Sequence, residues 1–566
     1  MGKKWVIKKH DYDAVSSLAA CLDVSPLVAA LLIARGYKDE EAARRFINPC
    51  LDDLNDPFLL KGIEPAVARI RSAVANNEKI LIWGDYDVDG TTGTVLLRKA
   101  LTCLGAATGF HIPNRFTEGY GPNKEFLEKA KNDGYRLVIT VDCGTRSFEP
   151  LAWAMENGLD VIVTDHHLSD PENGLPRAVA VVNPNQEGCG YPDKQLAGVG
   201  VALKLAQALL GDGVSPVLMN EFLEIASIGT VADVMKLTGE NRSIVSLGIR
   251  ELVRTRNFGL RALMEVSDCS SEMTSLHIGF RIAPRINAAG RMDVARHVVE
   301  LLEATEPTAA RRFAGVLDSR NRERQKMQQD ITERAMLEAM QSDDNRFVVV
   351  GGDGWHRGVI GLAASKIAER MNRPAIVLSI ENGVAHGSAR TVGDFHILDA
   401  LAGCGELFLQ YGGHAAAAGL KIESGRIDEL RRRLNETARR ILGEAELERV
   451  VEVDAVVSSS TLCLEMLDQL ACLEPFGVGN TKPVFVTRGL TLRRDPLVMK
   501  ERHLKFDVSD AAGKRFEAVW WDGVERSKEQ TFDPGCGIEV AYTAEANSWQ
   551  GQKRLQLVIE DIRIEI

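Results

Sequence analysis

The stretch Gly84-Asp85-Tyr86-Asp87-Val88-Asp89-Gly90 directly follows an apolar run at residues 80–83 and holds three carboxylates at alternate positions. In an extended backbone, side chains at i, i+2 and i+4 project to one side, so we expect the three acids to converge. Like charges at close range are costly unless cations neutralise them, which makes the stretch a candidate metal site. A solvated Asp-rich turn is the alternative. A calcium loop of the EF-hand type would need a Glu where the chain has Leu96.

Short apolar runs at 137–141, 161–164 and 178–182 alternate with helical segments beyond this stretch. Strands that alternate with helices predict an α/β fold with a parallel sheet covered on both faces. Asp142 follows the first run, and Asp165-His166-His167 follows the second. Ligand sites of open parallel sheets lie outside the carboxyl ends of the strands, so we expect these clusters to meet at one edge. Asp233, after a predicted helix, could complete the constellation.

The 566 residues exceed the roughly 250–300 at which a single hydrophobic core stops growing, so we expect three or four domains. A run rich in Arg, Glu, Gln, Met and Ala, without proline after Pro307, predicts a long connector helix to about Ser342. A second α/β pattern follows it, and from about Val450 short strand-like runs predict a small β-barrel. The expected domains are an N-terminal helical segment (1–60), a catalytic domain (61–305), the connector (306–343), a second α/β domain (344–447) and the barrel (448–566).

Composition and charge exclude several classes of protein. A hydrophobic content of 45% and a charged content of 26% are typical of a folded globular chain. The net charge of −11 argues against a wholly basic nucleic-acid coat protein, although a local groove can still be basic. The longest uncharged apolar run, Leu27 to Ala34, is far shorter than the ~20 residues of a membrane span, so we expect a cytoplasmic protein. The ten scattered cysteines predict neither a zinc ribbon nor a disulfide framework.

The acidic stretch, Asp142, Asp165-His166-His167 and Asp233 together resemble the four motifs of the DHH phosphoesterase superfamily. The glycine-rich segment Gly412-Gly413-His414-Ala415-Ala416-Ala417-Ala418-Gly419 is similar to a motif of its associated DHHA1 domain. Three further motifs resemble the superfamily's branch of bacterial single-strand-specific 5′→3′ DNA exonucleases: Ile112-Pro113-Asn114-Arg115, Arg285-Ile286-Asn287-Ala288-Ala289-Gly290-Arg291 and Gly387-Ser388-Ala389-Arg390. Trp83 stands where pyrophosphatase members of the superfamily carry a metal-binding His, which favours the exonuclease branch.

The resemblance implies a fold and a set of site residues. The fold is a parallel-sheet DHH domain, joined by the long helix to a DHHA1-type α/β domain, with a C-terminal OB-fold barrel. The expected metal ligands, for two Mn²⁺ or Mg²⁺ ions, are Asp87, Asp89, Asp142, His166 and Asp233, with Asp142 bridging. The expected catalytic residues are Asp85, Asp142, His167 and Arg285. The expected substrate-binding residues are Arg115, Asn287, Arg291, Ser388, Arg390 and His414, among which Arg115, Ser388 and Arg390 would hold a 5′-phosphate.

The implied function is metal-dependent degradation of single-stranded DNA from the 5′ end to 5′-mononucleotides, in DNA recombination and repair. A carboxylate and imidazole ligand set without thiolate suits such hard or borderline ions. A phosphodiesterase or phosphatase of the same superfamily, acting on short oligonucleotides or cyclic dinucleotides, is one alternative. A replication scaffold without catalysis is another. The expected partners are single-stranded DNA and, by the same resemblance, a single-strand-binding protein and a helicase; we expect a monomer without a membrane partner.

Cations and aromatics are available for a DNA strand outside the acidic cluster. Several arginines lie on the connector helix, although an ordinary solvated helix would show the same pattern. An OB-type barrel stacks bases on aromatic rings and follows the backbone with cations. The available side chains there are Phe506, Phe516, Trp520, Trp521, Trp549, Lys500, Arg502 and Lys505. Core packing is the default expectation for most of the aromatics.

Overall fold

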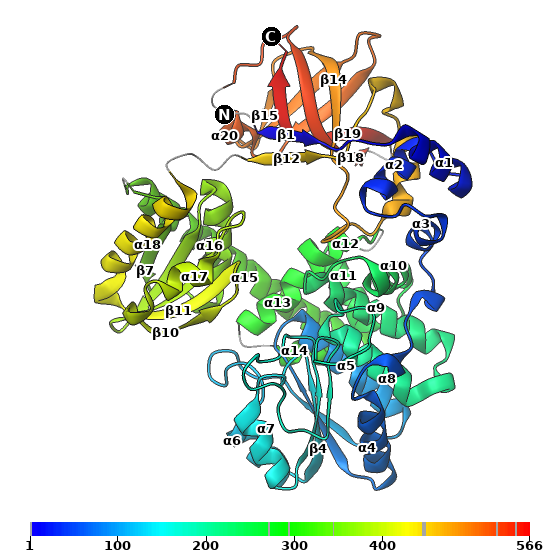
Figure 1. Ribbon diagram of the computed structural model, residues 1–566, viewed down its shortest axis with the longest axis vertical. Helices are drawn as coiled ribbons and strands as arrows, with labels where there is room; N and C mark the ends of the chain where they lie inside the picture. Colours follow the sequence, from blue (N-terminus) through cyan, green and yellow to red (C-terminus); the bar gives the residue numbers. More distant parts are fainter. Residues whose placement is uncertain are drawn as a thin grey trace.

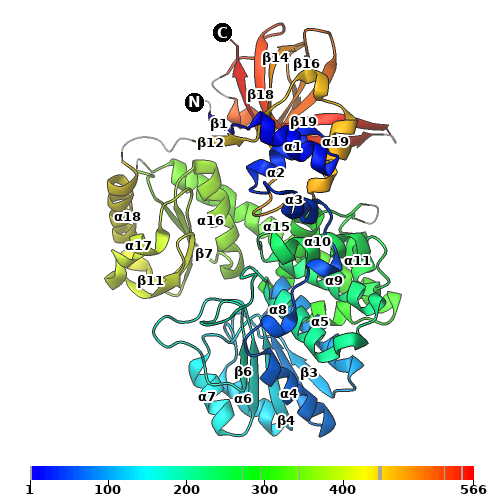
Figure 2. The same ribbon diagram turned by 45° about the vertical axis from the view of Figure 1, so that its right-hand side comes forward.

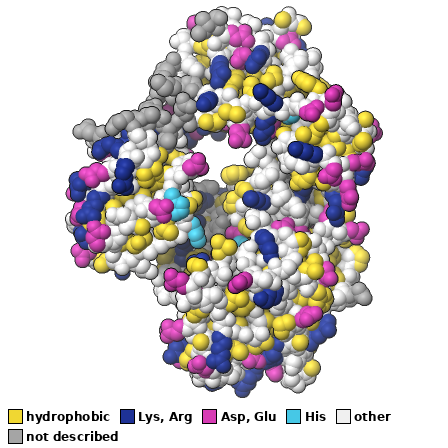
Figure 3. All heavy atoms as spheres, viewed as in Figure 1, with side chains coloured by type: hydrophobic (Ala, Val, Ile, Leu, Met, Phe, Trp, Pro, Cys, Tyr) yellow, Lys and Arg dark blue, Asp and Glu magenta, His cyan; other side chains and the backbone are white. Residues whose placement is uncertain are grey.

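The computed structural model describes residues 3–269, 272–292, 295–342, 344–443, 449–527, 530–549 and 552–565. Three lobes surround a central opening (Figure 1 and Figure 3). The lower lobe in Figure 1 holds the first α/β domain and a set of helices, the left lobe holds the second α/β domain, and the upper lobe holds the C-terminal sheet. Figure 2 shows the same three lobes from another side.

The first sheet has five parallel strands in the order β3-β2-β4-β5-β6, which confirms the predicted parallel sheet. Its strands are β2 (Lys79–Gly84), β3 (Thr108–His111), β4 (Tyr135–Val141), β5 (Asp160–Thr164) and β6 (Ala180–Val182). Strand β3 was not expected. Ile80 and Ile82 pack in one core while Leu81 and Trp83 pack in another, because alternate side chains face opposite sides of a strand. Both faces are therefore buried, as continuous Val/Ile runs predict.

Helices cover both faces of this sheet. On one face lie α4 (Ile63–Ala75), α5 (Val88–Cys103) and α8 (Gly198–Leu210), and on the other lie α6 (Lys124–Asn132) and α7 (Phe148–Glu156). The helices α9 (Pro216–Ala232), α10 (Gly239–Leu252) and α13 (Ala283–Arg291) complete the lobe. The predicted connector helix is confirmed as α15 (Pro307–Met340), 34 residues long.

The second sheet is mixed and has the order β10-β11-β9-β8-β7. Its strands are β7 (Val348–Asp353), β8 (Ala375–Glu381), β9 (Val384–Arg390), β10 (Phe408–Gly413) and β11 (Ala417–Glu423). Only β7 and β8 run parallel; β9, β10 and β11 are antiparallel additions. Helices α16 (Arg357–Met371) and α18 (Ile427–Leu442) pack against this sheet. The strands that carry the Gly387–Arg390 and Gly412–Gly419 motifs were not expected.

The C-terminal sheet has seven strands in the order β13-β14-β18-β19-β17-β16-β15, and β14 also pairs with β16, which curls the sheet. The expected small β-barrel stays a prediction. The strands are β13 (Ala455–Val456), β14 (Phe485–Leu492), β15 (Leu497–Met499), β16 (His503–Ser509), β17 (Arg515–Trp520), β18 (Gly537–Trp549) and β19 (Gln552–Ile564).

The N-terminal segment packs on this C-terminal sheet, although the two are far apart in the sequence. It begins with an unexpected strand, β1 (Lys4–Ile7), which pairs in parallel with β12 (Val450–Val453). The expected helices follow and share one core with the sheet: α1 (Tyr12–Leu22), α2 (Pro26–Ala34) and α3 (Glu40–Ile47). Within the described ranges no single helix has the length and apolarity of a membrane span; α1 and α2 together would, but they are bent by 112°.

Arg242 on α10 fastens the upper lobe to the lower one. It is buried, and its guanidinium stacks on the ring of Phe46 at 3.6 Å. It donates hydrogen bonds to four backbone carbonyls, those of Phe46, Cys472, Leu473 and Glu474. One side chain thus joins the lower lobe, helix α3 and the C-terminal region.

Candidate metal centre

The acidic stretch converges by a different route from the expected one. Asp85 follows β2, but the backbone then turns into helix α5 at Val88 instead of remaining extended. Asp87 is the N-cap residue of that helix, and its carboxylate accepts a hydrogen bond from Gly90 N at 3.0 Å. Asp89 lies in the first turn. The expected alternation in an extended backbone is therefore wrong, and a strand, a turn and a helix bring the acids together.

Asp89 is held by the start of another helix. The backbone amides of Gly198 and Val199, at the N-terminus of α8, donate to its two carboxylate oxygens at 2.6 and 2.8 Å. The helix has no cap of its own, so the buried carboxylate satisfies two of its free amides. Burial and the nearby Asp87 carboxylate nevertheless raise the pKa of Asp89 to about 7.

Asp142 follows β4 with a left-handed backbone, φ 62°. This conformation is uncommon for a residue other than glycine and often marks a functional position. The α8 backbone approaches so closely that a Cβ on Gly198 would lie 2.6 Å from the Asp142 Cβ. Only glycine fits at position 198, and Asp142 is consequently buried between β4 and α8.

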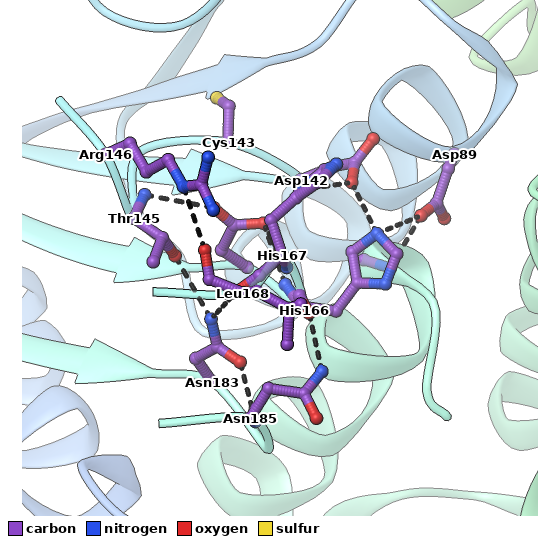
Figure 4. A network of polar contacts seen from close by, with 12 residues as sticks. Asp89, Asp142, Cys143, Thr145, Arg146, His166, His167, Leu168, Asn183 and Asn185 are labelled. Carbon is purple, nitrogen blue, oxygen red and sulfur yellow. Dashed lines mark hydrogen bonds and ion pairs between the residues drawn. The ribbon is translucent and has the colours of Figure 1, made fainter. Parts of the chain in front are cut away.

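Two histidines follow β5 and differ in their partners (Figure 4). His166 Nε2 lies 3.2 Å from Asp142 Oδ1, 3.5 Å from Asp233 Oδ2 and 3.8 Å from Asp89 Oδ2. Burial and the neighbouring His167 lower the pKa of His166 to about 4, so its ring is neutral, as a metal ligand must be.

His167 is oriented by Asp165. Its Nδ1 lies 2.7 Å from Asp165 Oδ1, and the backbone amides of Thr145, His166 and His167 also donate to that carboxylate. Although burial opposes it, the Asp165 hydrogen bond and charge raise the pKa of His167 to about 9. Asp165 therefore positions the ring of His167, and its own pKa lies below the usual range despite burial.

The acids and histidines form overlapping groups suited to divalent cations. Ligand atoms lie within 4.8 Å of one another in three sets: Asp85, Asp87 and Asp142; Asp89, His166 and Asp233; and Asp142, His166 and His167. Asp142 belongs to two of these sets and lies 3.2 Å from His166 of the third, as a bridging ligand would. Among the residues that the structure describes, Asp85 Oδ1, Asp142 Oδ1 and His166 Nε2 are buried without a hydrogen-bond partner. Orphaned acceptors of this kind fit a pair of hard metal ions.

Electrostatics point the same way. Burial and neighbouring carboxylates raise the pKa of Asp85 and Asp142 well above the ordinary value. Burial, Asp89 and Asp87 raise the pKa of Asp233, the residue that ends α9, to about 9. Without cations these acids repel one another, and bound divalent ions would relieve that repulsion.

A pocket of about 330 Å³ is lined by acids of the ligand cluster and by positive groups; we call the acids its acidic wall and the positive groups its arginine wall. Arg115, in the loop after β3, lies 5.2 Å from the ring of Tyr86. Asn287 and Arg291 on α13 also face this pocket. The Arg291 guanidinium donates to the carbonyl of Gly358 at the start of α16, and so it touches the left lobe.

Ser388 and Arg390 lie on β9 in the left lobe. The Arg390 guanidinium donates to Ser388 Oγ at 3.0 Å and to the carbonyl of Ala389 at 2.7 Å. Burial and the charge of Arg115 lower the pKa of Arg390.

Six predicted residues are not part of the pocket lining: Asp89, His166, Ser388, Arg390, Arg285 and His414. Arg285 binds Asp318 at 3.0 Å and also donates to the carbonyls of Arg281 and Val266. Its guanidinium is thus engaged between α13 and α15, and it does not line the metal pocket. His414 is exposed at the turn between β10 and β11, where its amide donates to the carbonyl of Ala417.

Sequence reasoning missed Tyr120. Its hydroxyl lies 3.1 Å from the carbonyl oxygen of Asp142 and 3.3 Å from His167 Nδ1, so its ring borders the pocket. It shares a loop with Arg115, but its sequence position gave no signal of that contact. Cys143 packs in the core and Trp83 is buried against His111 and Phe126, away from the ligands.

Most of the described aromatic side chains of the C-terminal sheet pack in its core, as expected. Phe506, Phe516 and Trp520 are buried in its core, whereas Trp521 is 50% exposed beside His503. The side chain of Trp549 lies outside the described residues. A cavity on this sheet has Arg494, Lys505, Lys514, Arg515 and Arg554 in its lining.

Comparison with known proteins finds three matching domain families. Residues 79–230 match the DHH family, N-terminal domain; residues 344–440 match the DHHA1 domain; residues 453–561 match the RecJ OB domain. The chain is 40% identical to the single-stranded-DNA-specific exonuclease RecJ of Bacillus subtilis, over 99% of this chain and 71% of that protein. It is 32% identical to the Escherichia coli exonuclease of the same name, over 98% of both.

Solved structures agree with these matches. The structure of RecJ in complex with Mn²⁺ from Thermus thermophilus has a TM-score of 0.84 and 29% identity, covering 99% of this chain and 79% of that chain. A structure of exonuclease RecJ bound to manganese has a TM-score of 0.60 and 33% identity, covering 69% of this chain and 97% of that chain.

Proposed function

Because the chain belongs to the RecJ family of single-stranded-DNA-specific exonucleases, we propose that it hydrolyses single-stranded DNA from the 5′ end and releases 5′-mononucleotides. The role we propose is in DNA recombination and repair, and the proposed cofactors are two Mn²⁺ or Mg²⁺ ions, as the metal-bound relatives suggest. One observation carries the proposal: a single pocket is lined both by Asp85, Asp87, Asp142 and Asp233 of the ligand cluster and by Arg115 and Arg291.

The geometry supports the ligand roles that we propose. Asp85, Asp87 and Asp142 would hold one ion, and Asp89, His166 and Asp233 the other, with Asp142 between them. Two ions there would supply Lewis acidity toward the scissile phosphate and an activated water. His167, protonated and oriented by Asp165, is placed to stabilise negative charge that develops on the phosphate or the leaving oxygen.

We assign recognition of the DNA 5′ end to groups on and near the arginine wall. A terminal phosphate carries more negative charge than an internal one, and guanidinium groups bind it bidentately. Arg115, Arg390 and Ser388 would form this subsite, with the lower lobe contributing the first and β9 the other two. Asn287 and Arg291 would bind the strand beside the scissile bond, and His414 would contact it from the β10–β11 turn. Arg285 would act by positioning α13, since Asp318 and two carbonyls occupy its guanidinium.

A digestion assay tests the proposal. Single strands of ~50 nucleotides, labelled at either the 5′ or the 3′ end, are incubated with Mn²⁺ or Mg²⁺. We expect a labelled mononucleotide to appear at once from the 5′ label and only late from the 3′ label, with duplex DNA of the same sequence resistant. Immediate release from the 3′ label would contradict the polarity. A strong preference for a ~5-nucleotide strand over the ~50-nucleotide one would support a phosphatase instead, and no cleavage of either would support a scaffold.

The proposal has three further parts: a cytoplasmic location, a monomeric state and, by family resemblance, cooperation with a single-strand-binding protein and a helicase. Light scattering of the purified chain tests the monomer. Co-purification with each tagged partner tests the cooperation, and localisation of a fluorescent fusion tests the compartment.

A further inference from the structure

The connector helix α15 carries a buried arginine, Arg324, which is 9% exposed. No ion pair joins it to a carboxylate in the part of the chain that the structure describes. Its guanidinium donates to Asn321 Oδ1 at 2.5 Å and to Gln328 Oε1 at 2.7 Å, within one turn on either side. Both acceptors are neutral amides, so they fix the orientation of the guanidinium and leave its charge uncompensated. A buried charge without a counter-charge is destabilising unless a ligand supplies one.

Arg291 lines the same cavity as Arg324, so the fold sets a second cation near this buried charge. Burial, together with the charges of Arg115, Arg324 and Arg390, lowers the pKa of Arg291 to about 10. These four arginines come from the loop after β3, from α13, from α15 and from β9, so the fold gathers positive charge from separate elements. The proposed 5′-phosphate subsite uses Arg115 and Arg390 and leaves Arg324 without a role.

A cavity of about 600 Å³ gives Arg324 access to a ligand. Asn287 and Arg291 line both this cavity and the metal pocket, so the two spaces adjoin. From there the cavity reaches residues 476–482 of the C-terminal region. Its apolar lining includes Val234 and Phe280, which are 66% and 78% exposed. A surface with fixed cations on one side and exposed apolar groups on the other suits a nucleic-acid strand, whose phosphates and bases differ in this way.

We propose that Arg324 is a further substrate-binding residue, which binds a backbone phosphate of the DNA strand on the 3′ side of the scissile bond. The inference rests on the proposed function. The terminal phosphate is assigned to the Arg115 side of the metal pocket, and the cavity with Arg324 continues from the boundary formed by Asn287 and Arg291. A strand that leaves the metal pocket toward the C-terminal lobe therefore passes Arg324. The apolar lining would contact bases without reading their edges, so it adds no sequence preference.

Binding measurements in EDTA, which prevents cleavage, test this role. Arg324→Gln removes the charge, Arg324→Lys keeps it, and Arg322→Gln is the matched control. Arg322 lies on the same helix, but its guanidinium is exposed and paired with Asp318 at 2.7 Å. The probes are a 5′-phosphorylated 20-nucleotide strand and a 5′-phosphorylated dinucleotide, which has no phosphate on the 3′ side of its single phosphodiester. Affinities are measured over a range of salt concentrations.

We expect Arg324→Gln to weaken binding of the 20-nucleotide strand about tenfold and to reduce the slope of log affinity against log salt by about 0.7, the value for one phosphate contact on a single strand. Dinucleotide binding should be unchanged, Arg324→Lys should keep the slope, and Arg322→Gln should behave as wild type. A merely structural role of Arg324 would leave the slope unchanged, and that result would overturn the proposal. Equal weakening of the dinucleotide would place Arg324 in the terminal-phosphate subsite and would also overturn it.

A second measurement does not depend on the variants being folded. Strands with one neutral methylphosphonate linkage, moved position by position, are bound to the wild-type protein. We expect one linkage on the 3′ side whose neutralisation costs about tenfold in affinity, and no such cost for that linkage in Arg324→Gln. If no position on the 3′ side has an effect, the proposal fails while the exonuclease function stands. If wild-type protein neither binds nor degrades single strands, the proposed function itself fails.

Discussion

The two walls of the central pocket differ in how the fold assembles them. The acidic wall is built from one sheet: Asp85, Asp142 and His166 follow three neighbouring parallel strands, and α5 and α9 add the remaining acids. The arginine wall, together with Arg324 on α15 and Arg390 on β9, comes from two lobes and the helix between them. Like charges are crowded on both walls, so each wall favours ligands of opposite charge. The proposed metal ligands therefore need the lower lobe alone, whereas the proposed strand-binding groups depend on how the lobes are placed.

The largest effect should come from breaking the acidic wall. Asp142→Asn removes the charge shared by two ligand groups, so cleavage of 5′-labelled single strands should fall by about a thousandfold or more in single-turnover assays. The fold should persist, because the change removes a buried carboxylate that its neighbours repel. Thermal unfolding in EDTA checks this, and a midpoint well below that of wild type would mean that the lost activity reflects unfolding.

Glu224 on α9 is a buried carboxylate that belongs to neither wall. Burial raises the pKa of Glu224 on α9 from 4.5 to about 7, although Thr255 Oγ1 donates to it. Folding therefore favours the protonated carboxyl, and the destabilisation grows as pH rises from 4.5 to about 7 and is complete above. Glu224→Gln should raise the free energy of unfolding by up to about 3 kcal/mol at about pH 8, and the gain should vanish near pH 4.5.

Denaturant unfolding at several pH values measures this effect. The exposed Glu41→Gln on α3 is the control and should change little at any pH. A gain from Glu224→Gln that is equal at acid and alkaline pH would show that the carboxyl is not destabilising in its charged form.

The contribution of Arg390 can be isolated by comparing DNA strands with different 5′ ends. Arg390→Gln removes one charged donor from the proposed 5′-phosphate subsite, which corresponds to a loss of about thirtyfold in kcat/KM on 5′-phosphorylated strands. Strands with a 5′-hydroxyl should be degraded equally by the variant and the wild type. If both substrates lose equally, Arg390 does not recognise the terminal phosphate.

The smallest effect should come from Tyr120, which contacts two residues of the acidic side of the pocket. Tyr120→Phe keeps the ring and removes the hydroxyl that contacts the Asp142 carbonyl and His167. One neutral hydrogen bond is worth about 1 kcal/mol, so kcat should fall about fivefold with KM little changed. Steady-state kinetics measure it, and a rise in KM without a change in kcat would assign Tyr120 to strand binding instead.

Sequence patterns were sufficient for the acidic wall because its information is local. Continuous Val/Ile runs identify strands buried on two faces, and the residue after each run must lie at the same edge of a parallel sheet. The connector helix was equally visible from its composition. Even here the reason for convergence was wrong, since an N-cap at Asp87 cannot be distinguished from an extended segment by alternating carboxylates alone.

The remaining features depend on contacts between distant segments. Nothing near Gly198 in the sequence predicts that the Asp89 carboxylate caps the start of α8. Nothing near Lys4 predicts its pairing with residues around Val450. The strands β9, β10 and β11 are rich in Gly and Ala, which weakens a strand signal. Arg324 has the appearance of an ordinary helix cation, and only its burial among neutral amides sets it apart.

The central claim, that acids from separate strand ends form one two-ion site, is tested most directly by counting bound Mn²⁺. Titration of the metal-free protein with Mn²⁺, followed by the electron paramagnetic resonance signal of the free ion, gives the stoichiometry without any assay of activity. We predict two ions per chain for the wild type and no tightly bound pair for Asp142→Asn. Undiminished binding of two ions by Asp142→Asn would contradict the account.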